Sequence, residues 1–312
     1  FITYHLRLAG TEDAGHSGFP GYHLLVILVG CFPASFFAIT SLKKRPGLES
    51  SQADFKKWMV ILLCVVLVIF SIVQTKSVHY SSLAYFPVTF LAALAMERFC
   101  MSSPSEKGRV PKGLKMALFT TAFLIAAVFI ALPFFMKNTV HFAGQFGNEF
   151  VKASLLADVN WTGWEMLPGL VLLAGLGVMF WFVRTKRPIA VSTTLFVTMT
   201  FTTSLAVTVI FPKVLQHTQG AAIEFYQSKA TEDCYVDHIG GKSFLDLFYT
   251  KKPFPDNPNH ADSYWLMRKK TGKPTYFVIR IDRLHKLEGY DGKMVEIGRK
   301  DGFVFYERIE NE

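Results

Sequence analysis

The first 212 residues are organised as long hydrophobic blocks separated by short polar segments, without the short alternation of a soluble sheet protein. Each uncharged block is close to the roughly 20 residues that a helix needs to cross a bilayer. The six blocks are residues 24–42, 58–75, 77–96, 116–136, 166–183 and 188–212. This pattern predicts six transmembrane helices. Pro33 and Pro87 fall inside two blocks and predict interrupted helices there, because proline cannot donate the backbone hydrogen bond.

After residue 212 the hydrophobic stretches become short and polar residues separate them. The pattern predicts helices over 220–228, 243–249 and 282–287, and strands over 234–239, 276–281 and 303–309. Strands that alternate with helices indicate a small α/β domain. We therefore divide the chain into a loop (1–22), a transmembrane bundle (23–212) and an α/β domain (213–312).

Basic residues are distributed unevenly between the loops. Thirteen lie in the loops after the first, third and fifth blocks. The segments on the other side carry four before the C-terminal domain begins: Arg7, Lys76, Lys137 and Lys152. The positive-inside rule places the richer loops in the cytoplasm. The opening segment, the break at Lys76, the loop 137–165 and the C-terminal domain are then extracytoplasmic, which in a bacterium means the periplasmic side of the inner membrane.

The overall composition supports a membrane protein. Hydrophobic residues make up 51% of the chain and charged residues 18%, below the roughly 25% charged of soluble domains. Of the net charge of +9, +8 belongs to the hydrophobic part and is concentrated in its loops, so it does not indicate nucleic-acid binding. The four cysteines have no metal-type spacing and predict no disulfide framework. The sequence singles out no cofactor and leaves a divalent cation as a candidate.

The break between the second and third blocks, KSVHYSSLAYFP (76–87), concentrates polar chemistry at a membrane boundary. It contains Lys76, His79, Tyr80 and Tyr85. Ionisable side chains at such a position are costly to remove from water, so they indicate a binding site. An interfacial belt of aromatic residues and a snorkelling lysine is the alternative interpretation.

The opening segment carries His5, Arg7 and His16 just before the first block. A guanidinium presents a planar fork of donors that matches phosphate oxygens, so this segment is a second candidate for binding an anionic headgroup. A solvated loop is the alternative. The chain begins at Phe1 without a signal-peptide pattern, and we expect the opening segment to be the end of a larger loop.

These features in this order resemble the C-terminal half of membrane glycosyltransferases that use polyprenyl-phosphate-linked sugars, such as the lipid A aminoarabinose transferases and the protein O-mannosyltransferases. The resemblance rests on His5 and Arg7, on the residues CFP (31–33), on TKSVHY (75–80) with FP (86–87), and on the tail GAAIEFY…DCYVDHIGGKSFLDLFYTKKP. It covers nearly the whole chain. Val78 and Leu83 stand where many members of this group carry prolines.

The resemblance implies a GT-C type enzyme that moves a sugar from a polyprenyl-phosphate donor to a lipid, protein or glycan acceptor. It implies that Lys76 and Tyr80 bind the donor phosphate together with Arg7 and His5, and that His79, His16 and Tyr85 line the cavity. The catalytic base is then an acidic residue in an outside loop upstream of Phe1. The alternatives are a transporter or flippase of lipid-linked intermediates, and a membrane-anchored binding protein whose C-terminal domain is the functional part.

Overall fold

The computed structural model describes residues 19, 21–43, 49–73, 76–101, 111–241, 243–253, 257, 259, 262–290 and 293–309. The chain divides into two compact units. Unit 1 comprises Phe1–Ala126 and Leu170–Phe201, and unit 2 comprises Ala127–Gly169 and Thr202–Glu312. We take each unit by itself.

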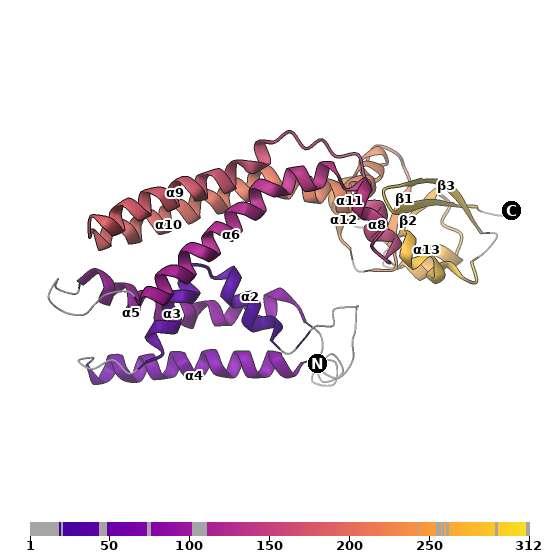
Figure 1. Cartoon of the computed structure of the whole chain (residues 1–312). Coiled ribbons are helices and arrows are strands. Elements are labelled where there is room, and N and C mark those ends of the chain that lie inside the picture. The colour runs from indigo at the N-terminus through magenta and orange to yellow at the C-terminus, as the bar shows by residue number, and fades with distance from the viewer. Residues whose placement is uncertain are drawn as a thin grey trace. The chain divides into compact units, whose positions relative to one another are not determined.

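Five helical stretches are long and apolar enough to cross a membrane: Ser50–Ile72, Val78–Met101, Lys112–Lys137, Trp164–Arg184 and Pro188–Ser228. They contain α4 (Ser50–Ile72), η2 (Val78–Ala84) with α5 (Tyr85–Met101), α6 (Lys112–Lys137), η3 (Trp164–Met166) with α9 (Leu167–Arg184), and α10 (Pro188–Leu205). Figure 1 shows them as long ribbons. Five of the six predicted spans are thus present as continuous helical stretches, and the chain is a multi-pass membrane protein.

The first predicted span, 24–42, is interrupted next to Pro33, as the sequence predicted. The structure has two short helices, α2 (Tyr22–Gly30) and α3 (Ala34–Ser41), and the chain bends by 111° between them. Pro33 is the residue directly before α3. A proline inside a helix removes a hydrogen bond and its ring clashes with the preceding turn, which is why the helix ends here.

The bent pair α2–α3 nevertheless runs between the two ends of α4. At one end the ring of His23 lies 5.7 Å from that of Phe70. At the other end Lys56 Nζ donates to the carbonyl oxygen of Lys43 at 2.6 Å. Lys56 and Phe70 are about 21 Å apart along α4 at the helical rise of 1.5 Å per residue. Among the described residues, the two ends of α2–α3 thus lie near opposite ends of α4, which favours one broken span, the sixth, over a re-entrant loop.

The interruption predicted at Pro87, in contrast to that at Pro33, is wrong. The chain is helical from Val78 to Met101, first as the 3₁₀-helix η2 and then as α5. Pro87 lies in the first turn of α5, where a missing N–H costs little because the first-turn donors have few intrahelical partners.

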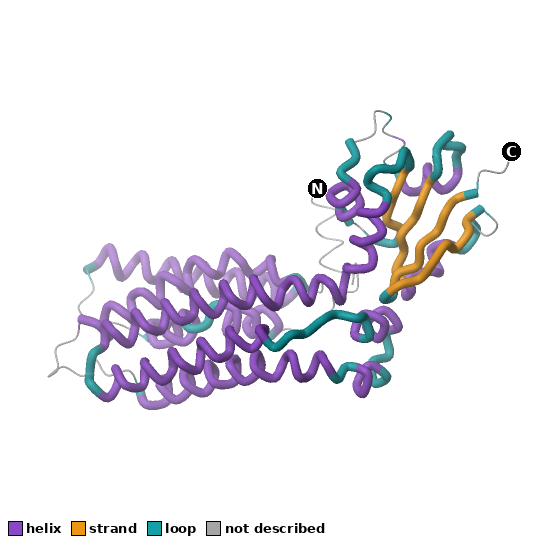
Figure 2. Tube along the Cα trace, turned by 90° about the horizontal axis from the view of Figure 1, so that it is seen from above, coloured by secondary structure: helices purple, strands orange, loops and turns teal. Residues whose placement is uncertain are grey.

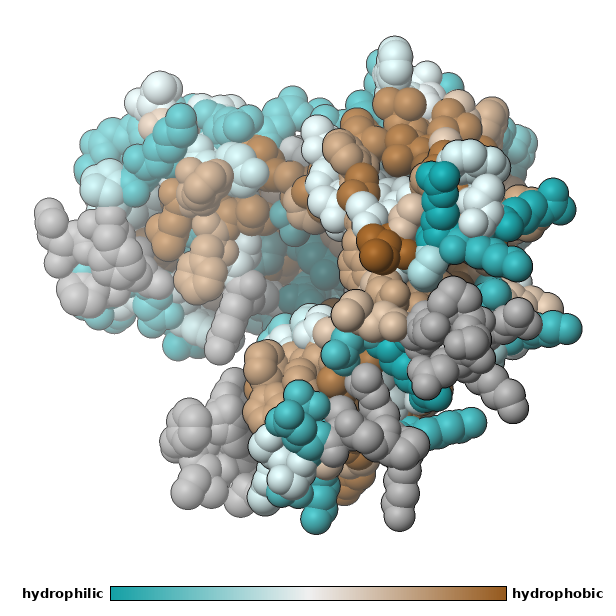
Figure 3. Space-filling model, turned by 90° about the vertical axis from the view of Figure 1, so that its left-hand side faces the viewer, coloured by the Kyte–Doolittle hydropathy of each residue, from teal (hydrophilic) through white to brown (hydrophobic). Residues whose placement is uncertain are grey.

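The basic residues that flank these helices gather at one end of unit 1. Lys43 and Lys57 lie near the start of α4, and Arg184 and Arg187 flank the turn between α9 and α10. Figure 3 looks onto this end, where hydrophilic side chains project around the hydrophobic helices. These residues belong to the loops rich in lysine and arginine that the positive-inside rule assigns to the cytoplasmic side.

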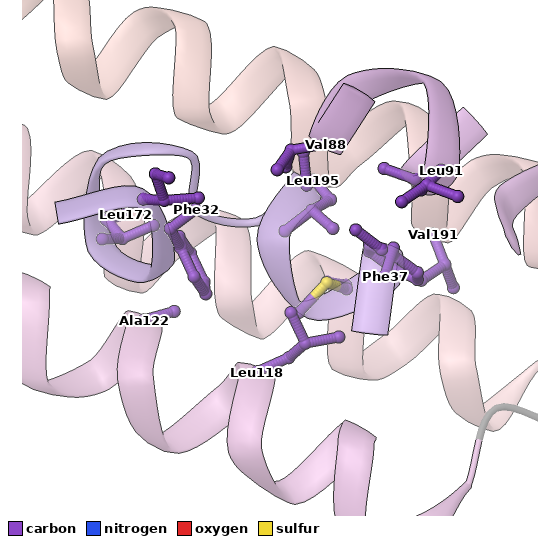
Figure 4. Packing of buried hydrophobic residues seen from close by; sticks show 14 of the residues in the cluster. Phe32, Phe37, Val88, Leu91, Leu118, Ala122, Leu172, Val191 and Leu195 are labelled. Atoms are coloured by element: carbon purple, nitrogen blue, oxygen red, sulfur yellow. The ribbon is translucent and has the colours of Figure 1, made fainter. Parts of the chain in front are cut away.

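The core of unit 1 takes its buried side chains from helices α2, α3, α4, α5, α6, α9 and α10. Phe32 packs near Ala122 and Leu172, and Phe37 lies among Leu118 and Val191 (Figure 4). The bent pair thus supplies the central side chains of the bundle. Because both halves of the broken crossing are covered by other helices, the backbone groups freed at the bend can be satisfied inside the protein.

The last long helix continues well beyond a membrane span. The five residues Ala206–Ile210 form a π-helical turn, η4, that joins α10 to α11 (Phe211–Ser228). The stretch Pro188–Ser228 has 41 residues, about 62 Å, which is twice the roughly 30 Å of a bilayer core. The limit drawn from the sequence between residues 212 and 213 falls inside this continuous helix.

Unit 2 is built on a four-stranded sheet of order β1-β2-β4-β3 (Figure 2). The strands are β1 (Tyr235–Ile239), β2 (Thr275–Arg280), β3 (Met294–Lys300) and β4 (Phe303–Arg308). β1 and β2 are parallel, and β4 is antiparallel to both β2 and β3. The connections are α12 (Leu245–Thr250), α13 (Ser263–Arg268) and η6 (Ile281–Leu287), and α7 (Val140–Ala143) and α8 (Glu149–Leu155) precede the sheet.

Both faces of the sheet are covered. On one face Phe277 and Val304 pack with Leu266 and Met267 of α13. On the other face Val278, Phe303 and Phe305 pack with Ala222 and Tyr226 of α11. The three predicted strands and the helices at 220–228, 243–249 and 282–287 are confirmed as β1, β2, β4, α11, α12 and η6. The edge strand β3 was not predicted.

Candidate functional site

The break between α4 and α5 places Lys76 under the C-terminal end of α4. Lys76 Nζ donates to the carbonyl oxygens of Phe70 and Ser71, each at 2.9 Å, and of Val73 at 2.5 Å. Carbonyls at a helix C-terminus have no intrahelical donor and carry partial negative charge, so a lysine there is favourable. Lys76 is only 6% exposed. Its three N–H donors are all used within the chain, so Lys76 offers a ligand its charge.

Tyr80 lies beside this lysine on the first turn of the next span. Its ring stacks on Phe70 with centroids 5.5 Å apart, and His79 approaches it edge-on at 4.6 Å. The Oγ of Ser77 and the Nδ1 of His79 are 2.7 Å apart. His79 is exposed and Tyr80 half-buried. Among the described residues no hydrogen-bond partner is present for the Tyr80 hydroxyl, so it can donate to a ligand.

His23 completes this group, and the sequence analysis missed it. It lies in the first turn of α2, with its ring 5.7 Å from Phe70 and 5.1 Å from Tyr22. Its exposure is 0%, yet neither ring nitrogen has a hydrogen-bond partner in the part of the chain that the structure describes. Lys76 is close enough to His23 for their charges to interact. The only sequence signal was a histidine directly before a charge-free block.

A buried histidine elsewhere in the chain shows what a fully paired imidazole looks like. In unit 2, His217 Nε2 accepts from Trp161 Nε1 at 2.9 Å, and its Nδ1 lies 2.8 Å from the carbonyl oxygen of Ser154. Because Nε2 accepts, Nδ1 must carry the proton and donate, which fixes the neutral tautomer. Both polar atoms are satisfied and His217 has a structural role. His23, in contrast, has no hydrogen-bond partner for either ring nitrogen among the described residues.

The remaining predicted site residues fall into two groups. His5, Arg7 and His16 lie outside the described residues, so their part in the site stays a prediction. Tyr85 is half-buried and packs against the hydrophobic core of unit 1. The structure thus brings Lys76, His79 and Tyr80 together and adds His23. The roles assigned to them remain predictions.

Metal binding gains no support from the described part of the chain. In that part, no three His, Cys, Asp or Glu side chains lie close enough together to hold a metal ion. Carboxylates and imidazoles are the usual ligands of divalent cations. The divalent cation left open by the sequence therefore has no candidate site among these residues.

Comparison with solved structures gives a likeness over nearly the whole chain. The structure of ArnT from Cupriavidus metallidurans bound to undecaprenyl phosphate superposes with a TM-score of 0.57 at 16% identity, covering 99% of this chain and 55% of that one. The apo state of the same protein gives a TM-score of 0.53 at 17% identity, covering 94% and 53%. No family model matches the sequence, and no curated protein matches it.

This chain has the fold of a segment of ArnT. Both the helical bundle and the small mixed sheet fall within the superposed region, because the first superposition takes in 99% of the chain. The resemblance to polyprenyl-phosphate-dependent glycosyltransferases is confirmed at the level of the fold. The chain spans about half the length of these structures.

Proposed function

We propose that this chain is part of an integral-membrane glycosyltransferase that takes its sugar from a polyprenyl-phosphate donor. The observation that carries the proposal is the fold shared with ArnT, whose structure contains undecaprenyl phosphate. The group at the break between α4 and α5 supports it, because Lys76, Tyr80 and His23 combine a fixed positive charge with unpaired polar groups.

The chemistry of transfer explains why such a group is useful. The bond between the anomeric carbon and the phosphate oxygen breaks, the acceptor oxygen bonds to that carbon, and its proton passes to a base. The departing polyprenyl phosphate gains one negative charge. Lys76 stabilises this charge more strongly as it develops, and a site shielded from water strengthens the effect.

The proposed roles of the residues that bind the donor phosphate differ from those expected from the sequence. Lys76 supplies charge, since its N–H donors are directed at α4. The hydrogen bonds to the phosphate oxygens come instead from the Tyr80 hydroxyl and a ring N–H of His23, with Arg7 and His5 closing the site. An acidic residue upstream of Phe1, as the resemblance implies, activates the acceptor. Acceptors in this proposal are lipid A, protein or another glycan, on the periplasmic side of a bacterial inner membrane.

The test uses the full-length protein in lipid nanodiscs and measures binding of undecaprenyl phosphate. Lys76→Ala and Tyr80→Phe are expected to weaken binding about tenfold or more, equivalent to about 1.4 kcal/mol or more. Lys56→Ala is the matched control. It removes a second buried lysine, which lies within α4 and donates to a backbone carbonyl at the opposite end of that helix from Lys76.

Sugar transfer is followed by mass spectrometry with a panel of polyprenyl-phosphate sugars. A glycosylated acceptor distinguishes the transferase from a flippase, which would move the donor across the bilayer without consuming it. If both variants bind undecaprenyl phosphate as tightly as the unmodified protein, the break is an interfacial belt and the donor site lies elsewhere.

A further inference from the structure

Unit 2 contains a cavity of about 700 Å³ beside the parallel edge of the sheet. Its lining includes the carboxylates of Asp237 on β1 and Asp246 on α12, and the apolar side chains of Phe244 and Leu247. Phe244 is 77% exposed. The cavity therefore has exposed apolar side chains on its lining together with the buried Asp246 and the half-buried Asp237.

The two carboxylates have incomplete hydrogen bonding. Asp246 is 8% exposed and its Oδ1 has no partner among the described residues, and the same holds for Oδ2 of Asp237. Asp237 Oδ1 accepts from the backbone N–H of His238 at 2.7 Å. A buried carboxylate oxygen without a donor is costly, and such atoms are rare in native proteins.

The lysines that line the same cavity have partners other than these acids. Lys252 donates to the carbonyl oxygens of Glu232 at 2.8 Å and Cys234 at 2.6 Å. Lys273 pairs with Asp233 at 2.6 Å. Among the described residues, neither lysine pairs with Asp237 or Asp246, so the two carboxylates lack a cationic partner from these lysines.

The pKa values of both carboxyl groups are raised, as expected for acids that are shielded from water and lack a cationic partner. Burial, and then the neighbouring charge of Asp237, raise the pKa of Asp246 to about 6. Burial also raises the pKa of Asp237. Near neutral pH, Asp246 is thus ionised at a cost that a bound cation would relieve.

We infer that this cavity binds a ligand through an ammonium group, which donates to Asp246 Oδ1 and Asp237 Oδ2 while its carbon skeleton lies against Phe244 and Leu247. An ammonium has three donors and no acceptor, which suits two carboxylate oxygens that lack donors. The described residues provide no group of three metal-ligating side chains here. The inference does not depend on the proposed glycosyltransferase activity.

The experiment measures the thermal unfolding midpoint of the full-length protein in phosphatidylcholine nanodiscs with millimolar putrescine. Its matched control is 1,4-butanediol, which has the same chain length and no charge, at equal ionic strength. Putrescine is expected to raise the midpoint by about 2 to 4 °C at saturation, because a ligand that binds only the folded state stabilises it. The diol is expected to have no effect.

Variants locate the effect. Asp246→Asn and Asp237→Asn are isosteric and are each expected to abolish the rise, and the second secures the result if the first does not fold. Asp233→Asn is the control, since Asp233 also lines the cavity but is paired with Lys273. An unchanged midpoint with putrescine, or an equal rise in both Asp246→Asn and Asp237→Asn, would overturn the inference.

A second arm identifies the source of the ammonium group. Phosphatidylethanolamine carries an ammonium headgroup and phosphatidylcholine carries a quaternary amine without N–H donors. If nanodiscs containing phosphatidylethanolamine abolish the response to putrescine, the ligand is a lipid headgroup. If the response persists, the ligand is a soluble amine. A response in neither lipid refutes the site.

Discussion

At the scale of single residues, Lys76 and His23 of the proposed donor site have opposite hydrogen-bonding states. Lys76 has an acceptor for each N–H, whereas His23 is fully buried with no partner for either ring nitrogen among the described residues. A buried group without partners lowers stability unless a ligand uses it. His23 therefore offers a way to separate stability from binding at this site.

We predict that His23→Phe stabilises the protein and weakens donor binding. Removing the unpaired nitrogens should raise the free energy of unfolding by about 1–3 kcal/mol, measured as a higher thermal midpoint. The same variant should lose much of the additional stabilisation that undecaprenyl phosphate gives the unmodified protein.

Two controls accompany this prediction. His23→Gln keeps an N–H donor and should retain more of the phosphate effect. His217→Phe breaks the bonds to Trp161 and Ser154 and should lower stability. A His23→Phe protein that still responds fully to undecaprenyl phosphate would remove His23 from the site. A lack of response in the unmodified protein would instead count against the proposed function.

At the scale of helices and strands, packing between α9 and α10 depends on one glycine. A Cβ at Gly175 would lie 2.3 Å from the Oγ1 and Cγ2 of Thr198. Small residues at such contacts let two membrane helices approach closely. Gly177 lies two residues further along α9, and a Cβ added there would have no heavy atom within 4 Å.

Gly175→Ala is therefore expected to destabilise the bundle by about 1–3 kcal/mol, because Thr198 is stiff at χ1 and the helices must separate. Gly177→Ala on the same helix should be neutral or stabilising by up to about 1 kcal/mol, since alanine favours helix more than glycine does. Thermal unfolding of both variants in the same nanodiscs compares them. Equal midpoints would mean that the two helices are not held by this contact.

The same scale shows what the sequence could and could not predict. Long charge-free blocks determine membrane helices almost alone, so five spans were found. Both prolines predicted an interruption, and only Pro33 produces one. Pro87 lies in the first turn of α5, where proline is tolerated, and a hydropathy pattern does not contain that position within the helix. The edge strand β3 is largely exposed on both faces, so it lacks the apolar signature that identified β2.

The site was predictable only in part for a related reason. Lys76 and Tyr80 stand out because they interrupt an apolar pattern. His23 is 53 positions before Lys76 in the sequence numbering, and only the packing of α2 against the end of α4 brings it there. Likewise, Asp237 and Asp246 become neighbours because α12 folds back on β1. Contacts of this kind depend on the tertiary fold.

At the scale of the whole molecule, the broken crossing decides the topology. A re-entrant α2–α3 would place both its ends on one side of the membrane, and the opening segment would then lie opposite Lys76. The contacts His23–Phe70 and Lys43–Lys56 put its ends at opposite ends of α4. With α2–α3 as a crossing, two crossings precede the break at Lys76 and six precede α11, so the predicted topology keeps both on the same side as the start of α2.

This topology predicts the labelling of single cysteines in intact cells. In a variant without Cys31, Cys64, Cys100 and Cys234, each test position is exposed: His141→Cys, Arg187→Cys and Lys270→Cys. A membrane-impermeant maleimide should label positions 141 and 270 in intact cells with a permeable outer membrane, and position 187 only after lysis. The basic residues around position 187 are the physical reason, since they favour the cytoplasmic side. Labelling of position 187 in intact cells, or protection of position 270, would contradict the predicted orientation and with it the proposed periplasmic donor site.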